Sequence, residues 1–494
     1  MKKLYIFSLI CILAIASINT FAQEIKSLTL ENVIELSETQ SPDAILAKHR
    51  FRASYWQYRT FKAEYLPSLM LTGNLPDYSR AYEKEYDYQT GQEYYVEKNT
   101  NNVMGTLSLS QNIGFTGGSI SVQSDFRRFD VLGDDASTQY ISTPISIRYS
   151  QPLFRYNELK WQKQIEPLKY EEAKKEYLDA VEQVHLRAVM RFFQLAQAQI
   201  NMEISNMNYA NADTLYRIAQ GRYNLGTIAE NELLQMELSF LNAGAAQNAA
   251  NISLRDMELR LRSFLGYNEN IRLELVIPDK IPNIEVDMQR TLELATENNP
   301  EIINLGIQLL EASQSVAQAK AEKGLNANMN VSYGLQGTST TISGAYQDLD
   351  NQQGLQIGFS VPIMDWGLRR GRYRMAQSSE EVVKTTVQQA IVDFEQQIFL
   401  DVAQFNLQDD QVRIAAKSDT VAQKMFEVTK QRFLIGNVDV LELNNADTKK
   451  DENRRAYIQS LQNYWTYYFN IRRLTLFDIE SDQPLRADYE GLIE

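Results

Sequence analysis

Two distant stretches of this 494-residue sequence read alike, and their spacing limits what the chain can fold into. Residues 221–235 read GRYNLGTIAENELLQ, and residues 431–445 read QRFLIGNVDVLELNN. Each has an arginine, an aromatic residue, an aliphatic residue and a glycine, followed by a short polar break and an acidic residue. Gly226 and Gly436 lie 210 residues apart, and the blocks ISIRYSQPLF (145–154) and LQIGFSVPIM (355–364) keep the same offset. We infer one large internal duplication.

A further matched pair of blocks has a larger offset. TLENVIELSETQSPDA (29–44) resembles DMQRTLELATENNPEI (287–302), and Pro42 matches Pro300 at a distance of 258 residues. Each proline follows a capping residue and precedes an acid, which predicts helices over 42–65 and 300–323. The larger offset means that the first half has about 48 extra residues between its blocks. They include an alternating pair, 103–115 and 120–126, which fits either an added hairpin of a sheet or an outer excursion.

Each half also has a region in which apolar and polar residues alternate. Leu107, Leu109, Ile145 and Ile147 are examples in the first half, and the run Leu355 to Ile363 is an example in the second. Alternation with a period of two predicts strands with one apolar and one polar face. An outer-membrane sheet and a half-buried soluble sheet both have this pattern.

Long helices are expected to end at the two glycines. The pattern predicts helices of about 65–70 residues before Gly226 and Gly436, and return helices over 228–265 and 438–475. A helix of that length spans about 100 Å and cannot bury itself in one globular core. We therefore expect coiled-coil or helical-barrel packing along its length. Pro167 predicts that the first long helix is kinked or begins there.

Composition and the N-terminal segment limit the cellular context. Lys2, Lys3 and the apolar run from Leu4 to Ile18 predict a signal peptide over residues 1–22. Cys11 is the one cysteine and lies within that segment, so we expect neither a disulfide nor a thiolate metal site in the mature chain. The net charge of −14 argues against nucleic acid as a partner. No apolar run after residue 22 reaches 18 residues, so a membrane-spanning part would have to be a β-barrel.

The chain resembles the TolC family of outer-membrane channel proteins. The resemblance depends on the signal peptide, the duplication, the two strand exits QPLF and VPIMDWG, and the two glycine turns. It implies a mostly α-helical fold with a membrane β-barrel portion, in which three identical chains form a TolC-like α-helical barrel and share one β-barrel. It implies that the chain begins with a signal peptide (1–22). A first repeat (23–266) follows, with strands at about 68–154 and a helical hairpin at 155–266, and then a connector (267–299) with IRLELVIP as a candidate strand. A second repeat (300–475) has strands at about 327–364 and a hairpin at 365–475, and a C-terminal tail (476–494) ends the chain.

The same resemblance implies a function and partners. Such proteins are passive exit ducts in the outer membrane of a Gram-negative bacterium, and they extend into the periplasm. They dock with a periplasmic adaptor, also called a membrane fusion protein, and with an inner-membrane transporter of the RND or ABC type. We expect an efflux duct for small molecules that needs no cofactor. The exit duct of a type I protein secretion system and a soluble periplasmic coiled-coil scaffold or adaptor remain alternatives.

The two glycine turns would form the periplasmic tip, where the adaptor docks. Glycine adopts the left-handed conformation that ends a helix, and Thr227-x-x-Glu230 predicts a capping box at the start of the next helix. The predicted docking residues are Tyr223, Leu225, Gly226, Thr227, Phe433, Ile435, Gly436 and Asn437.

The resemblance also places the pore aperture. Its acidic rings fall on Glu442 and Asn445, which are three residues apart and share a helix face, with Glu232 in the equivalent place of the first half. Three Glu442 carboxylates at one aperture would repel each other, which predicts proton uptake or a bound cation. Asn445 stands where the family has a second acid, and Val438 replaces a basic residue that helps to latch the closed tip in the best-known member. The sequence does not predict how this tip is latched.

The remaining residues predict no catalytic or metal chemistry. His49 and His185 are too few and too far apart in the sequence for a zinc site and are expected to be solvated or packed. The sequence contains no P-loop, nucleophile elbow, zinc-protease motif or dinucleotide fingerprint. We therefore expect no enzyme activity and no metal site.

Overall fold

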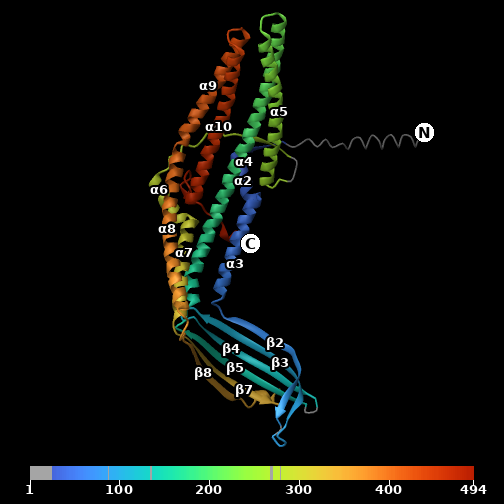
Figure 1. The fold of residues 1–494 in the computed structure, drawn as a ribbon, viewed down its shortest axis with the longest axis vertical. Helices are drawn as coiled ribbons and strands as arrows, with labels where there is room; N and C mark the ends of the chain where they lie inside the picture. The colour runs from blue at the N-terminus through green and yellow to red at the C-terminus, as the bar shows by residue number, and fades with distance from the viewer. Residues whose placement is uncertain (1–24, 87, 134–135, 268–270, 279, 494) are drawn as a thin grey trace, which may run out of the picture.

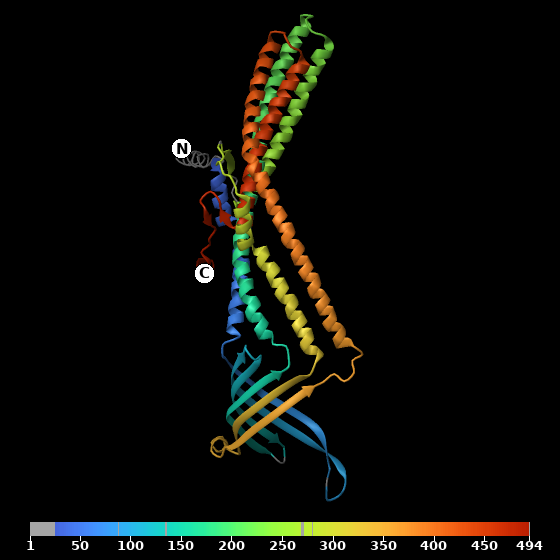
Figure 2. The same cartoon turned by 90° about the vertical axis from the view of Figure 1, so that its left-hand side faces the viewer.

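The structure is a long, narrow molecule with a β-sheet at one end and helical hairpins at the other (Figures 1 and 2). The computed structural model describes residues 25–86, 88–133, 136–267, 271–278 and 280–493. The predicted signal peptide over residues 1–22, including Cys11, lies outside the described residues.

The shorter helices repeat at the predicted offset of 258 residues. Helix α2 (Leu30–Gln40) corresponds to α6 (Met288–Asn298), and α3 (Pro42–Ala63) corresponds to α7 (Pro300–Lys323). Both α3 and α7 begin with proline after a capping side chain, because Ser41 accepts a hydrogen bond from the amide of Ala44 and Asn299 accepts one from the amide of Glu301. These helix starts are confirmed.

The first long helix, α4 (Glu158–Asn224), has 67 residues. Asn157 caps it, and it continues through Pro167, so the alternative that the helix begins at Pro167 is wrong. Its return helix is α5 (Glu230–Phe264).

The long helix of the second half differs from that of the first half. A single long helix was expected, but the structure has α8 (Leu368–Asn406) and α9 (Gln408–Leu434), divided at Leu407. The amide of Leu407 bonds to the carbonyl of Gln404, three residues back, which tightens the backbone there. The return helix is α10 (Val440–Thr475). None of the helices within the described residues has the apolar stretch that crossing a lipid bilayer requires.

The sheet has six strands in the order β2-β3-β4-β5-β7-β8, with antiparallel neighbours throughout. The extra residues of the first half are therefore an added hairpin of this sheet, within β3 and β4. The strands are β2 (Ser68–Tyr86), β3 (Glu93–Ile113), β4 (Gly118–Leu132), β5 (Ser137–Leu153), β7 (Asn326–Ser339) and β8 (Asp350–Ser360), with the short helix η1 (Gly344–Tyr346) between the last two.

The main core surrounds the middle of α4. Phe192, Phe193 and Leu195 of α4 are fully buried, together with Leu261 of α5 and Tyr464 of α10. A parallel pair of strands, β1 (Ile25–Thr29) and β6 (Arg272–Val276), packs against this core. Strand β6 confirms the strand that was predicted within IRLELVIP. The C-terminal elements are β9 (Phe477–Asp478), β10 (Gln483–Pro484) and α11 (Tyr489–Ile493).

The helices lie side by side in a fixed order. At the tip end the order is α5, α4, α10, α9, and at the sheet end it is α3, α4, α7, α8. Helices α5 and α9 are therefore the outer members of one four-helix layer, and α3 and α8 are the outer members of the other. Strands β2 and β8 are likewise the two edges of the sheet.

Candidate functional site: the tip of the helical hairpins and the two-faced sheet

The two tip turns have the same backbone geometry. Gly226 has φ +68° and Gly436 has φ +80°, which is the left-handed region that glycine adopts without strain. The amide of Thr227 bonds to the carbonyl of Arg222, and the amide of Asn437 bonds to the carbonyl of Arg432. Inside this six-to-one bond, the glycine amide bonds to the carbonyl of the residue that follows the arginine, and the two bonds together are a Schellman cap. The predicted left-handed glycine caps are confirmed.

The predicted capping box at Thr227 is wrong. Helix α5 has Ala229 as its N-cap and no side-chain cap. The Thr227 hydroxyl instead donates to the carbonyl of Arg222, at 2.9 Å, so it belongs to the end of α4. In the second half, Asp439 caps α10 by accepting a hydrogen bond from the amide of Glu442 at 2.8 Å. Thr227 therefore bonds to the end of α4 and does not cap α5, the helix that it was expected to start.

The residues predicted for the aperture lie at the start of the return helices. Glu442 and Asn445 are both exposed, whereas Leu443 and Ala446 are buried, so the first two share the outward face of α10. Glu232 is half-buried at the equivalent place in α5. Glu442 is not isolated, because its carboxylate lies 3.7 Å from the guanidinium of Arg432 across the turn.

The predicted docking residues differ in exposure. Leu225 and Ile435 are 80% and 72% exposed at the two turns. Phe433 is buried, and the Arg222 guanidinium lies 5.7 Å from the centre of its ring. Phe433 thus belongs to an apolar tip cluster that joins the two hairpins, and the other buried members are Ala219, Met236, Phe426, Val440, Leu443 and Ala446.

Polar contacts also join the two hairpins at the tip, and the sequence did not predict them. Arg222 donates to the carbonyl of Leu434 at 3.1 Å. Val438, where the resemblance led us to expect a missing basic latch residue, packs against the apolar tip cluster. The basic residue that bridges the tip comes from the other half of the duplication. Arg222 and Arg432 occupy equivalent positions in the two halves, so the sequence could have suggested both as residues that bridge the tip. It does not show that Arg222 bonds to Leu434 while Arg432 lies beside Glu442.

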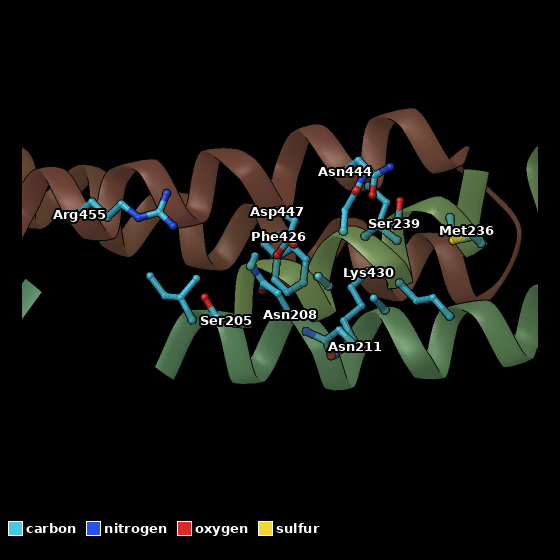
Figure 3. A pocket seen from close by; sticks show the side chains of 17 residues that line it. Ser205, Asn208, Asn211, Met236, Ser239, Phe426, Lys430, Asn444, Asp447 and Arg455 are labelled. Atoms are coloured by element: carbon cyan, nitrogen blue, oxygen red, sulfur yellow. The ribbon is translucent and has the colours of Figure 1, made fainter. Parts of the chain in front are cut away.

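Behind the tip, the hairpins enclose a cavity of about 350 Å³ between α4/α5 and α9/α10 (Figure 3). Lys430 donates to Asn211 at 3.2 Å, and Asn208 donates to Asp451 at 2.6 Å, so both bonds cross from one hairpin to the other. Burial raises the pKa of Asp447 on this seam, although the ammonium of Lys450 lies 2.6 Å away. The seam between the hairpins is therefore polar and incompletely packed.

The sheet has one apolar and one polar face. Strand register aligns Leu69, Leu109, Val122, Ile147 and Tyr333 in one row across five strands. The opposite face carries a hollow of about 560 Å³ that is lined mainly by polar residues, among them Ser121, Gln123, Ser146, Arg148 and Asn330. The alternation in the sequence therefore separates an apolar surface from a hydrophilic one.

Within the described residues, no group of three or more His, Cys, Asp or Glu side chains is arranged to hold a metal ion. The exposed features instead are a sheet with one apolar face, four-helix layers with unpaired outer helices, and a tip at which Leu225 and Ile435 are exposed. These features indicate a protein whose sheet contacts a membrane and whose helices extend away from it.

The chain belongs to the outer membrane efflux protein family, whose sequence profile matches residues 33–267 and 291–475. The two matches coincide with the two halves of the duplication. No curated protein matches the chain. The protein is accordingly an outer-membrane efflux channel that extends into the periplasm of a Gram-negative bacterium.

Solved structures share the fold at low sequence identity. The Campylobacter jejuni outer membrane channel CmeC has 16% identity and a TM-score of 0.65, over 94% of this chain and 88% of that one. The Vibrio cholerae outer membrane protein VceC has 14% identity and a TM-score of 0.60, over 92% and 97% of the two chains. The open state of the Neisseria gonorrhoeae channel MtrE has 13% identity and a TM-score of 0.51, over 93% and 91%.

Proposed function

We propose that three copies of this chain associate head to tail into one hollow cylinder. The cylinder is the passive exit duct of a tripartite efflux system for small molecules, and it has no enzyme activity of its own. One observation carries this proposal. The two outer helices at the tip end, α5 and α9, each have an apolar stripe that no described part of the chain covers.

The two stripes have coiled-coil spacing. On α9 and the residue before it, Leu407, Ile414, Val421 and Val428 recur every seven residues, and each is more than half exposed. On α5, the exposed residues Leu234, Leu238, Leu241, Ile252 and Leu259 fall on two alternating positions of a heptad, spaced three and four residues apart. Sustained heptads that face water within one chain indicate an interface between helices.

The stripes also match in height. Leu241 lies fifteen residues after Gly226, and Val421 lies fifteen residues before Gly436. The two helices run in opposite directions, so α5 of one copy and α9 of the next bring these two side chains to the same level. The contact joins two different surfaces, and such a heterologous contact closes into a ring when the rotation permits.

The sheet supports the same closure. Its two edges, β2 and β8, leave backbone groups unpaired in a single chain. Pairing β2 of one copy with β8 of the next would make eighteen strands from three copies, and barrels of about 16–18 strands hold an aqueous channel. The apolar face would then contact lipid and the polar face would line the bore.

The tip is the adaptor-binding and gating end in this proposal. The exposed turn residues, Leu225, Ile435 and their neighbours, present the surface for a periplasmic adaptor, and an inner-membrane transporter of the RND or ABC type supplies the energy. Glu442 and Asn445 line the aperture with Glu232. Arg432 beside Glu442 offsets part of the negative charge at this constriction.

Disulfide cross-linking tests the ring. The chain has one cysteine, Cys11, within the predicted signal peptide, so introduced thiols report on their own positions. We expect Leu241→Cys with Val421→Cys to form a bond between copies on oxidation, with a ladder on denaturing gels that ends at three chains. The cross-linked ring should conduct ions in planar bilayers.

A displaced pair is the control. Leu241→Cys with Leu407→Cys moves the second thiol by fourteen residues, or about 21 Å along the helix, beyond the reach of a disulfide. Equal cross-linking of both pairs, a ladder that ends at two chains, or a ring that carries no current would contradict the proposal.

A further inference from the structure

Basic residues gather where the helices meet the sheet. Within about two helical turns of the sheet, the ends of α3, α4, α7 and α8 and their connecting residues carry eleven basic and four acidic residues, in a chain whose net charge is −14. We call the eleven the basic girdle: Arg59, Lys62, Arg155, Lys160, Lys163, Lys320, Lys323, Arg369, Arg370, Arg372 and Arg374.

The basic girdle is unpaired within the protomer. Among the described residues, none of its eleven side chains lies in an ion pair, although basic residues further along the same helices do. On α4, Lys169 lies 2.8 Å from Glu311, and on α8, Lys384 lies 2.8 Å from Glu381. Ten of the eleven are exposed, and the exception, Arg369, donates to the carbonyl of Glu322. On α4 and α8, the change from paired to unpaired charge therefore occurs near the junction with the sheet.

Exposed apolar residues connect the basic girdle to the apolar face of the sheet. The outward residues of β8, such as Ile357 and Phe359, are followed at the same two-residue spacing by Val361 and Ile363. Ile363 is 96% exposed and Trp366 is 92% exposed, and the arginines begin three residues after Trp366. Tryptophan with arginine directly beyond an apolar surface is the arrangement found at membrane–water interfaces.

A neighbouring copy would not neutralise this charge. Helix α8 is an outer helix of its layer, and in the proposed ring it meets α3 of the next copy. The end of that α3 carries Arg59 and Lys62, with Glu64 as the one nearby acid. Closure of the ring therefore brings like charges together, which costs free energy unless an anion lies between them.

We propose that the basic girdle binds the phosphate groups of anionic phospholipids in the inner leaflet of the outer membrane. Its depth fits, because the seven residues from Leu368 to Arg374 rise about 10 Å and a bilayer headgroup layer is about 5–8 Å thick. The arginines hold the headgroups while Ile363 and Trp366 contact the acyl chains. The inference rests on the outer-membrane duct proposed above.

Native mass spectrometry of the detergent-solubilised assembly with phosphatidylglycerol tests this inference. We expect Arg370→Gln/Arg372→Gln/Arg374→Gln to weaken phosphatidylglycerol binding about tenfold or more, since each basic residue near a membrane surface contributes to anionic lipid attraction. The matched control is Arg413→Gln/Lys417→Gln/Lys424→Gln on α9, which removes the same charge far from the sheet and should leave binding unchanged. Arg155→Gln/Lys160→Gln/Lys163→Gln should weaken binding in the same direction and replaces the first variant if that variant does not fold.

Three results would overturn the inference. They are unchanged phosphatidylglycerol binding in both girdle variants, displacement of the lipid by millimolar inorganic phosphate, and loss of assembly with lipid binding intact. Conductance in planar bilayers separates this inference from the duct. If the variants conduct normally and still bind phosphatidylglycerol, only the lipid site fails, whereas absence of current from the unmodified protein contradicts the duct.

Discussion

His185 is the residue whose surroundings differ most from what its sequence neighbours suggest. It lies on α4 between two carboxylates, with Nδ1 3.3 Å from Glu182 and Nε2 3.5 Å from Glu38 of α2. Arg472 of α10 lies 3.1 Å from the same Glu182. Burial alone would lower the pKa of His185, but its contacts with Glu182 and Glu38 outweigh that effect and raise the pKa to about 9. The prediction of a packed histidine is consistent with this placement, but the three-helix ionic cluster has no sequence signal.

The raised pKa of His185 gives stability a pH dependence of known sign. The folded state binds the proton more tightly than the unfolded chain, so this contribution is complete below about pH 6.5 and is lost as the pH rises through about 9. We expect the thermal unfolding temperature to fall by about 2 °C or more between pH 6 and pH 9.5. His185→Gln should remove most of that fall, and the exposed His49→Gln should keep it. An identical pH slope in all three proteins would refute the assignment.

At the level of elements, the two hairpins end in the same way because both tip glycines occupy the left-handed region. No atom outside the turn lies within 4 Å of a Cβ built on Gly436 or on the helical Gly221. A substitution at Gly436 therefore acts through the backbone conformation alone. At Gly221, where φ is not positive, a side chain meets neither strain nor a clash.

Gly436→Val should loosen the tip turn. A left-handed conformation costs a residue with a side chain about 1–2 kcal/mol, which makes local opening about 5–30 times more frequent. Hydrogen exchange of the Asn437 amide should quicken by that factor. Gly221→Ala should leave exchange in the turn unchanged, because alanine suits a helix better than glycine does. Equal exchange rates in the two variants would show that the left-handed cap does not hold the turn.

For the whole molecule, polar contacts between the two hairpins hold the tip together. Arg222, Lys430 and Asn208 each bond across the seam beside the cavity. In the proposed ring, opening of the tip would separate α9 and α10 from α4 and α5. These bonds therefore oppose opening.

Arg222→Ala with Lys430→Ala should open the duct. Hydrogen bonds to charged groups contribute about 1.5–3 kcal/mol each, so their loss should shift the closed–open ratio by tenfold or more and raise conductance in planar bilayers. Arg217→Ala, which breaks only an exposed pair with Asp213 within α4, is the control and should conduct like the unmodified protein. Conductance that rises equally in the control would exclude a specific latch.

The sequence by itself determined the elements and their repetition. Proline starts, left-handed glycines and two-residue alternation are local rules of backbone and side chain, so α3, α7, the tip turns and the sheet strands were predictable from neighbours in the chain. The break at Leu407 and the true role of Thr227 were not, because each depends on which backbone hydrogen bonds form in the folded chain.

Only the tertiary structure decided how distant residues meet. It placed the extra hairpin inside the sheet, put Arg222 of one half against Leu434 of the other, and gathered His185, Glu38 and Arg472 from three helices. It also left the α5 and α9 stripes uncovered and, among the described residues, the basic girdle without ion pairs. The physical reason is that burial and ion pairing depend on distances between residues that are far apart in the sequence, such as Glu182 and Arg472, which are 290 positions apart. No local pattern encodes those distances.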